Sequence, residues 1–117
     1  MTQPPPSAIE HLSRVKAGPH VVTIGNFDGV HRGHQYLIHR VIDEAQSRGV
    51  RSLVVTFEPH PTAVLRPGQP FVRLTTPAVK LARIAETGID EIVVIPFDLE
   101  FAALEPREFL ALLVDTV

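Results

Sequence analysis

The sequence predicts an α/β fold built around a parallel sheet. Three short runs at 21–24, 53–57 and 92–95 are apolar and rich in β-branched residues, which is typical of buried strands. Helical spacings of apolar residues lie between these runs. Strands that alternate with helices are joined by right-handed crossovers, which makes the strands parallel. The length of 117 residues suits a single domain.

The first third of the chain should hold a strand, a loop and a helix. The strand, Val21–Ile24, is expected to be buried on both faces of the sheet. The loop at 25–33 contains three glycines. From His34 onward apolar residues recur at the spacing of one helix face, and Gly49 suits the C-terminal cap. We expect that face to belong to the core; it comprises Leu37, Ile38, Val41, Ile42 and Ala45.

The middle of the chain repeats this order. The second strand, Leu53–Phe57, leads into a long loop at 58–70 that holds four prolines. A second helix is expected over 77–87, because Thr76 can serve as its N-cap and a proline occupies its first position. Gly88 should end this helix, and the third strand follows it.

The two ends of the chain differ in character. Residues 1–18 form a proline-rich leader, with prolines within Gln3–Pro6, that we expect to be flexible. Residues 19–117 should form the folded domain. Pro106 should open a last helix, whose apolar face would comprise Phe109, Leu110 and Leu113.

Composition excludes several classes of function. The net charge of −2 provides no basic field, so nucleic acid is not an expected partner. No apolar run approaches the roughly 20 residues of a membrane span. The absence of cysteine excludes disulfides, thiol catalysis and cysteine-ligated zinc. The first ten residues lack the basic and apolar parts of a secretory signal, so we expect a cytoplasmic protein.

The informative stretch is the glycine-rich loop between the first strand and the first helix. In an open parallel sheet, ligands bind at the carboxyl ends of the strands. Glycines there let backbone N–H groups approach a phosphate, and the following helix adds the positive end of its dipole. The stretch is Gly25-Asn26-Phe27-Asp28-Gly29-Val30-His31-Arg32-Gly33-His34.

The two histidines of this loop are three residues apart, so they share a face if both lie in the first helical turn. Their imidazoles can donate hydrogen bonds to phosphate oxygens. Nucleotidyl transfer spreads negative charge over the α-phosphate and the departing pyrophosphate, and fixed donors stabilise that charge. A zinc pair is the alternative for His31 and His34. Zinc needs three or four ligands, and His60 is the obvious further candidate.

The loop resembles a known superfamily. His31-x-Gly33-His34 resembles the HxGH signature of nucleotidyltransferases, and the whole ten-residue stretch resembles its version in bifunctional bacterial FAD synthetases (riboflavin kinase/FMN adenylyltransferase). That family usually carries Asp where Glu58 stands. Further segments that resemble the family are Val55–Pro61, Leu74–Thr76 and Glu105–Leu110.

The resemblance implies a Rossmann-like parallel sheet of the HxGH nucleotidyltransferase type, with five strands in the order 3-2-1-4-5. This sequence supplies about three of the five strands, so the fold is expected to be incomplete. The family's second, serine/threonine-rich phosphate-binding signature and its riboflavin kinase domain are also absent. Residues 19–117 would therefore be a partial FMN adenylyltransferase domain.

The resemblance also implies roles for residues. His31 and His34 would be catalytic and contact the ATP phosphates. The nucleotide pocket would be formed by Gly25, Asn26, Phe27, Asp28 and Gly33. The flavin side would be bordered by Phe57, Pro59, His60 and Pro61. Mg²⁺ would accompany ATP, and no residue is assigned as a metal ligand.

Structural alternatives stand beside several of these roles. Asn26 can serve only to shape the turn, and Asp28 can brace the loop in an Asx-type turn. Gly29 serves turn geometry rather than a ligand. His60, between two prolines, suits a rigid surface loop equally well, and Arg66 and Arg73 suit solvated positions.

The function implied by the resemblance is the transfer of AMP from ATP to FMN, which yields FAD and pyrophosphate. Riboflavin kinase activity is expected only in a full-length protein. The alternatives are another HxGH nucleotidyltransferase, such as a cytidylyltransferase, and a non-catalytic or inactive nucleotide-binding fragment.

Overall fold

The predicted alternation of strands and helices is confirmed. A computed structural model describes residues 14–58, 65, 76–99 and 103. In chain order its elements are β1 (His20–Ile24), α2 (Arg32–Arg48), β2 (Arg51–Glu58), α4 (Pro77–Ala85) and β3 (Glu91–Pro96). Each strand is longer than the sequence predicts by one to three residues, because the residues that flank the apolar runs also pair in the sheet.

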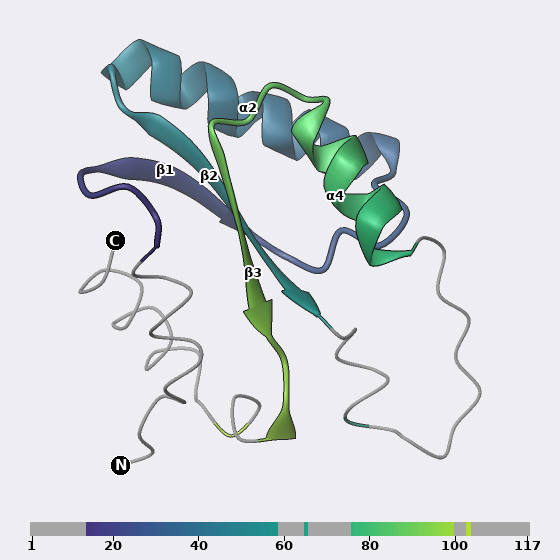
Figure 1. Cartoon of the computed structure of the whole chain (residues 1–117). Coiled ribbons are helices and arrows are strands. Elements are labelled where there is room, and N and C mark those ends of the chain that lie inside the picture. The colour runs from purple at the N-terminus through teal and green to yellow at the C-terminus, as the bar shows by residue number, and fades with distance from the viewer. Residues whose placement is uncertain (1–13, 59–64, 66–75, 100–102, 104–117) are drawn as a thin grey trace.

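The described strands form one parallel sheet in the order β1-β2-β3. β1 pairs with β2 from His20 opposite Arg51 to Ile24 opposite Val55, so these two strands point the same way. β2 and β3 are parallel as well. Successive strands step in one direction across the sheet. The right-handed rule then puts both crossover helices on the same face, which is where Figure 1 shows α2 and α4.

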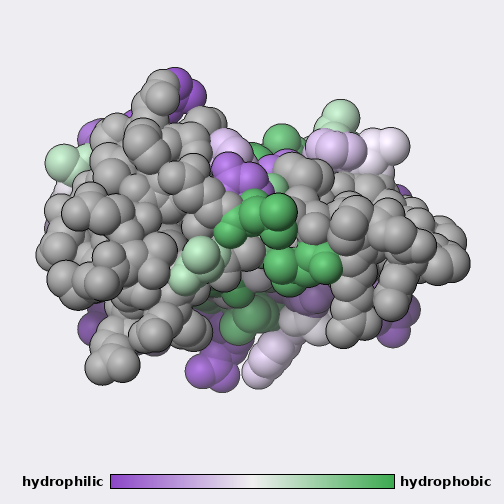
Figure 2. Space-filling model, turned by 90° about the horizontal axis from the view of Figure 1, so that it is seen from below, coloured by the Kyte–Doolittle hydropathy of each residue, from purple (hydrophilic) through white to green (hydrophobic). Residues whose placement is uncertain are grey.

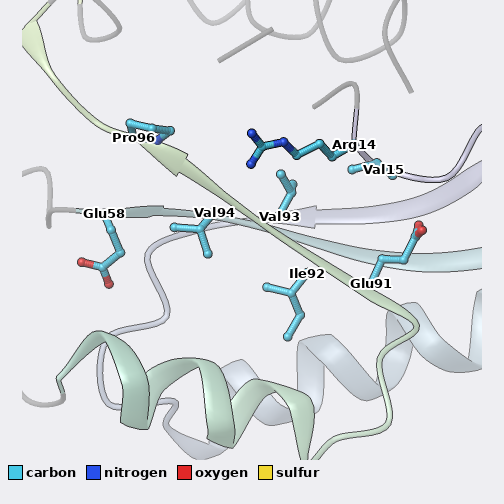
Figure 3. A pocket seen from close by; sticks show the side chains of 8 residues that line it. All are labelled: Arg14, Val15, Glu58, Glu91, Ile92, Val93, Val94 and Pro96. Carbon is cyan, nitrogen blue, oxygen red and sulfur yellow. The ribbon is translucent and has the colours of Figure 1, made fainter. Parts of the chain in front are cut away.

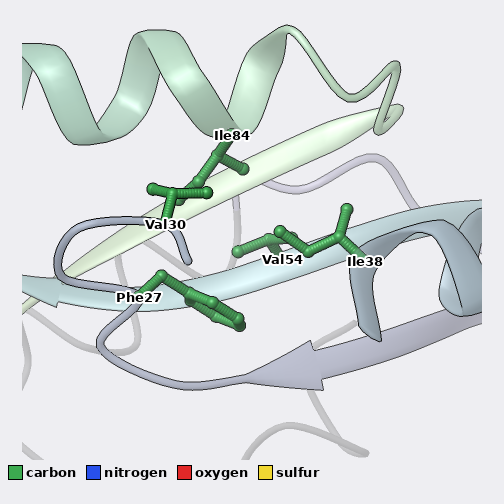
Figure 4. Close-up of a cluster of buried hydrophobic side chains, with 5 residues drawn as sticks. All are labelled: Phe27, Val30, Ile38, Val54 and Ile84. Atoms are coloured by element: carbon green, nitrogen blue, oxygen red, sulfur yellow. The ribbon is translucent and has the colours of Figure 1, made fainter. Parts of the chain in front are cut away.

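The core has one cluster on each face of the sheet, because neighbouring residues of a strand point to opposite sides. On the helix face Val54 packs with residues of the loop, α2 and α4 (Figure 4). The other cluster comprises Leu53, Val55, Val93 and Ile95. No helix among the described residues covers this second face. Figure 2, a view from below, shows apolar surface in the middle of the molecule.

The C-terminus of α2 and the N-terminus of α4 are capped as the sequence predicts. Gly49 adopts φ 67° at the C-terminus of α2, and its N–H and that of Val50 bond to the carbonyls of Gln46 and Ala45. This is the Schellman arrangement that glycine favours. At the start of α4 the Thr76 hydroxyl accepts a hydrogen bond from the N–H of Val79 at 3.2 Å.

Three predictions about these elements are wrong. Leu37 is 45% exposed, so it lies outside the core face of α2. β1 is not buried on both sides, since Ile24 is 38% exposed and β1 is the edge of the described sheet. α4 ends at Ala85 rather than Thr87, because the N–H groups of Thr87 and Gly88 bond three residues back and tighten the turn.

Two further predictions concern residues outside the described part of the chain. The helix expected from Pro106 lies there entirely. Most of the expected leader does too; its last residues, 14–18, form neither helix nor strand.

Candidate nucleotide site

The candidate site is the loop that joins β1 to α2. It leaves the sheet at the carboxyl end of β1, where the N–H of Gly25 still bonds to the carbonyl of Val55 in β2 at 3.0 Å. Because the strands are parallel, the carboxyl end of β2 lies at the same edge of the sheet. The loop therefore sits where α/β sheets bind ligands.

The loop contains a tight turn held in an unusual backbone conformation. The N–H of Val30 bonds to the carbonyl of Phe27 at 3.0 Å, and Gly29 has the positive φ, 81°, that glycine adopts readily. Phe27 and Val30 also have positive φ, 55° and 44°. That region is unfavourable for a β-branched residue, so the surroundings must hold Val30 there.

Burial supplies that restraint. The side chains of Phe27 and Val30 are 3% and 2% exposed and pack in the helix-face cluster (Figure 4). Their partners in that cluster are Ile38, Val54 and Ile84, one each from α2, β2 and α4. Fully burying a side chain of this size stabilises the fold by about 1.5–3 kcal/mol, which is similar to the roughly 1–3 kcal/mol of backbone strain and offsets most of it.

The structure brings the two predicted catalytic histidines together at the start of α2. His31 is the N-cap and is exposed, while His34 is the third helical residue and is partly buried. Their ring centroids lie 5.6 Å apart. The ring of His34 also meets the ring of Phe27 edge-on, with centroids 5.3 Å apart. A buried loop residue thus fixes one histidine, while the other faces solvent.

The hydrogen bond to His34 sets which nitrogen carries its proton. The backbone N–H of His31 donates to Nδ1 of His34 at 3.2 Å, so Nδ1 is an acceptor and a neutral ring carries its proton on Nε2. Partial burial, and then the charge of His31, lower the pKa of His34 below its ordinary 6.5. His34 is therefore neutral at pH 7 and offers Nε2–H as a donor.

The two glycines that border the site differ in the space that a side chain would find there. A Cβ on Gly25 would meet the Phe27 ring at 3.2 Å, so a larger residue there would press on this buried ring. A Cβ on Gly33 would meet nothing within 4 Å, and the φ of Gly33 is not positive. Nothing in the described fold demands glycine at 33, and the space above it is open at the helix N-terminus.

Asn26 and Asp28 are the remaining loop residues that were predicted to bind the nucleotide. The backbone carbonyl of Asn26 accepts a hydrogen bond from the Thr56 hydroxyl at 3.1 Å. Its side-chain Oδ1 is buried without a partner among the described residues. Asp28 is the second residue of the turn and is half-buried. These contacts agree with a role of Asn26 in shaping the loop.

Sequence reasoning missed a polar cluster beneath the loop. Lys80 of α4 is 1% exposed, and its ammonium contacts Thr56 and Glu58 at the carboxyl end of β2. Arg83, also from α4, donates to the carbonyl of Gly29 at 3.2 Å. The available signal was the position of Lys80, which lies one turn before Ile84 on the apolar side of a predicted helix.

The residues predicted for the flavin side are only partly described. The Phe57 ring packs on the second face of the sheet, with its centroid 5.9 Å from that of Phe97. It therefore lies on the opposite face from the helix-face cluster. Pro59, His60 and Pro61 lie outside the described residues, as do Arg66 and Arg73.

A zinc site receives no support within the described part of the chain, where no group of three histidines or carboxylates is placed to hold a metal.

A cavity of about 540 Å³ runs along β3 (Figure 3). Glu58 lines this cavity and also pairs with Lys80. The other side chains that line it are Arg14, Val15, Glu91, Ile92, Val93, Val94 and Pro96.

The parallel sheet, with its histidine-bearing loop at the carboxyl edge, defines a Rossmann-like α/β protein. A solved structure titled as a macrolide-efflux protein from Streptococcus pneumoniae matches it with a TM-score of 0.76 and 30% identity. The match covers 86% of this chain and 35% of that one. No helix among the described residues combines the length and apolar character that crossing a membrane requires.

The family model for FAD synthetase matches residues 13–117, so the chain belongs to the FAD synthetase family. Two relatives are named bifunctional riboflavin kinase/FMN adenylyltransferase. The protein from Escherichia coli (strain K12) is 39% identical over 103 residues, which are 88% of this chain and 33% of the relative. The protein from Bacillus subtilis (strain 168) is 36% identical over 101 residues, 86% and 32% respectively. The chain thus spans about a third of the length of these relatives.

Proposed function

We propose that the protein takes part in FAD synthesis by transferring AMP from ATP to the phosphate of FMN, with release of pyrophosphate. The observation that carries the proposal is the histidine pair at the N-terminus of α2, in which Nδ1 of His34 accepts a hydrogen bond and Nε2 is left as the donor. Membership of the FAD synthetase family and the printed names of the relatives support the choice of FMN as acceptor.

The chemistry needs no covalent intermediate on the protein. An oxygen of the FMN phosphate forms a bond to the α-phosphorus of ATP, and the bond from that phosphorus to the pyrophosphate oxygen breaks. Negative charge grows on the departing pyrophosphate. His34 Nε2–H and the backbone N–H groups of the first turn of α2 stabilise that charge. Gly33 leaves room for the polyphosphate to lie against the helix N-terminus.

Mg²⁺ enters this proposal as part of the substrate, bound to the phosphates of ATP. It neutralises the polyphosphate while keeping several of its water ligands, so few protein ligands are needed.

The test is FAD formation from Mg-ATP and FMN by the protein as its gene encodes it, followed by chromatography together with pyrophosphate release. His34→Ala should lower kcat by about 100-fold or more, the usual cost of losing one such donor. His39→Ala is the matched control, because His39 is an exposed residue of the same helix beyond the first turn. Its rate should be unchanged.

Two results would contradict the proposal. Pyrophosphate release with CTP in preference to ATP would indicate a cytidylyltransferase instead. Binding of ATP without any FAD formed, at saturating FMN, would indicate a nucleotide-binding module.

A further inference from the structure

Lys80 is a charged residue in the interior of the described fold. Its side chain is 2% exposed, although lysine is almost never fully buried unless its charge is paired. It lies on α4 and not on the loop that carries the histidines, and the proposed chemistry does not use it. Its burial therefore calls for another explanation.

The contacts of the Lys80 ammonium account for all three of its hydrogens. Nζ donates to the Thr56 hydroxyl at 3.0 Å and to the Phe57 carbonyl at 3.1 Å. It also pairs with Glu58 Oε1 at 2.8 Å. An ammonium has three donors and no acceptor, so the group is saturated and held in one place. All three partners belong to the carboxyl end of β2.

This arrangement imposes a direction on the Thr56 hydroxyl. Lys80 can only donate, so the hydroxyl oxygen must accept from Lys80 and its own hydrogen must point elsewhere. That hydrogen goes to the backbone carbonyl of Asn26, 3.1 Å away. Lys80, Thr56 and Asn26 thus form a relay of two hydrogen bonds from α4, through β2, to the first turn of the site loop.

The loop needs such a restraint because of its backbone. Asn26 immediately precedes Phe27, which has φ 55°, and Val30 has φ 44°. Residues in this region persist only where the surroundings hold them. α4 supplies two further contacts to the loop, the Arg83 bond to the Gly29 carbonyl and the packing of Ile84 on Val30. Lys80, Arg83 and Ile84 lie on the same side of α4, because Arg83 and Ile84 follow Lys80 by three and four residues.

We propose that Lys80 is a positioning residue for the nucleotide site. Through the Thr56 hydroxyl it holds the Asn26 carbonyl, and thereby the loop that presents His31 and His34 to the polyphosphate. The part of this inference that concerns ATP rests on the proposed function. The part that concerns the loop stands on the hydrogen bonds alone.

The first test is a double-mutant cycle on ATP affinity, measured by calorimetry. Thr56→Val removes the hydroxyl and keeps the shape, and Lys80→Met removes the ammonium and keeps most of the chain length. Each should weaken ATP binding by about tenfold or more, because small displacements of binding groups are costly. The double variant should be no worse than the weaker-binding single variant, because both substitutions interrupt the same relay.

Ser52→Ala is the matched control for Thr56→Val. Ser52 is also a buried hydroxyl of β2, but it lies near the amino end and bonds to Asp90. It should lower the melting temperature without changing ATP affinity. Additive losses in the cycle, or a loss of affinity in Ser52→Ala equal to that in Thr56→Val, would overturn the proposal.

The second test needs no nucleotide. In Thr56→Val, hydrogen exchange of the Val30 N–H, which bonds to the Phe27 carbonyl, should become about tenfold faster as the loop opens more often. The Val50 N–H, at the far end of α2, should be unchanged. If the unaltered protein binds no ATP, the proposed function fails, but the hydrogen-exchange measurement still tests the hydrogen-bond relay. An unchanged exchange rate of the Val30 N–H in Thr56→Val would refute the relay. This test uses Thr56→Val alone, so it does not depend on whether Lys80→Met folds.

Discussion

At the scale of single residues, the two ring nitrogens of His34 serve different purposes. Nδ1 accepts the hydrogen bond from the His31 N–H, which ties the ring to the start of α2. Nε2 is then left as the donor that can meet a phosphate oxygen. A second proton would have to go to Nδ1, where it would displace that bond. The neutral ring is thus the form that the local structure favours.

The pH dependence of stability should report this preference. Folding lowers the pKa of His34, so the unfolded chain takes up the proton more readily. The contribution of His34 to stability is complete above pH 6.5 and is lost as the pH falls from 6.5 through the folded pKa. Melting temperatures measured from pH 8 to pH 5 should therefore fall less steeply in His34→Gln than in the unaltered protein.

His39→Gln provides the comparison, since His39 is exposed on the same helix. Between pH 8 and pH 5 its melting temperature should fall as steeply as that of the unaltered protein. Equal slopes in all three proteins would contradict the assigned protonation of His34.

At the scale of elements, α2 depends on glycine at two places for different reasons. Gly49 needs its positive φ of 67° to end the helix, although a Cβ there would meet nothing within 4 Å. Gly33 has no such backbone requirement and an equally open surrounding. One glycine thus serves the fold, and the other leaves space at the site.

Alanine substitutions should separate these roles. Gly49→Ala should lower the free energy of unfolding by about 1 kcal/mol, because the left-handed conformation is unfavourable for alanine, and should leave ATP affinity unchanged. Gly33→Ala should do the reverse, keeping or raising stability while weakening ATP binding by about tenfold. Chemical denaturation and calorimetry on both variants would measure this; a stability loss confined to Gly33→Ala would refute the assignment.

At the scale of the whole molecule, the two edges of the sheet differ in function. The side of the sheet where the parallel strands end, the carboxyl edge, carries the candidate nucleotide site. At the side where the strands begin, the amino edge, charged groups tie the strands together. Glu91, at the start of β3, accepts hydrogen bonds from the Lys16 N–H and from His20 Nε2, and Arg51 Nε lies 3.5 Å away. Burial raises the pKa of the Glu91 carboxyl, but these donors and the Arg51 charge hold it below its ordinary value.

Acid should therefore weaken the fold at this edge. Because folding depresses the pKa of Glu91, its contribution to stability is present above its unfolded pKa, about 4.5, and is lost as the pH falls through the folded value. Glu91→Gln should lower the free energy of unfolding at pH 7 by about 2 kcal/mol, the usual worth of hydrogen bonds to a charged group. It should also reduce the loss of stability below pH 4.5.

Glu44→Gln is the control for this substitution. Glu44 pairs with Arg48 on the surface of α2 and is 52% exposed, so its loss should cost at most about 0.5 kcal/mol. Denaturation curves for both variants at pH 7 and pH 4 would decide. An effect of Glu44→Gln as large as that of Glu91→Gln would contradict the special role of the amino edge.

Local signals in the sequence were sufficient for the elements and for the position of the loop. Strand and helix periods, the Thr76 cap and Gly49 all depend on neighbours within one or two turns, and the structure has them as predicted. The pairing of His31 with His34 follows from their spacing of three at a helix start. Leu37 and Ile24 were assigned wrongly because burial depends on which elements cover a side chain.

By itself, the sequence determined the order of strands and helices, the loop that bears the histidines and membership of the FAD synthetase family. Tertiary structure alone decided how the loop is held, because Asn26, Thr56 and Lys80 lie far apart in the chain and meet only when the sheet and α4 pack. A lysine becomes a buried anchor only where folding gives its charge three partners and removes water.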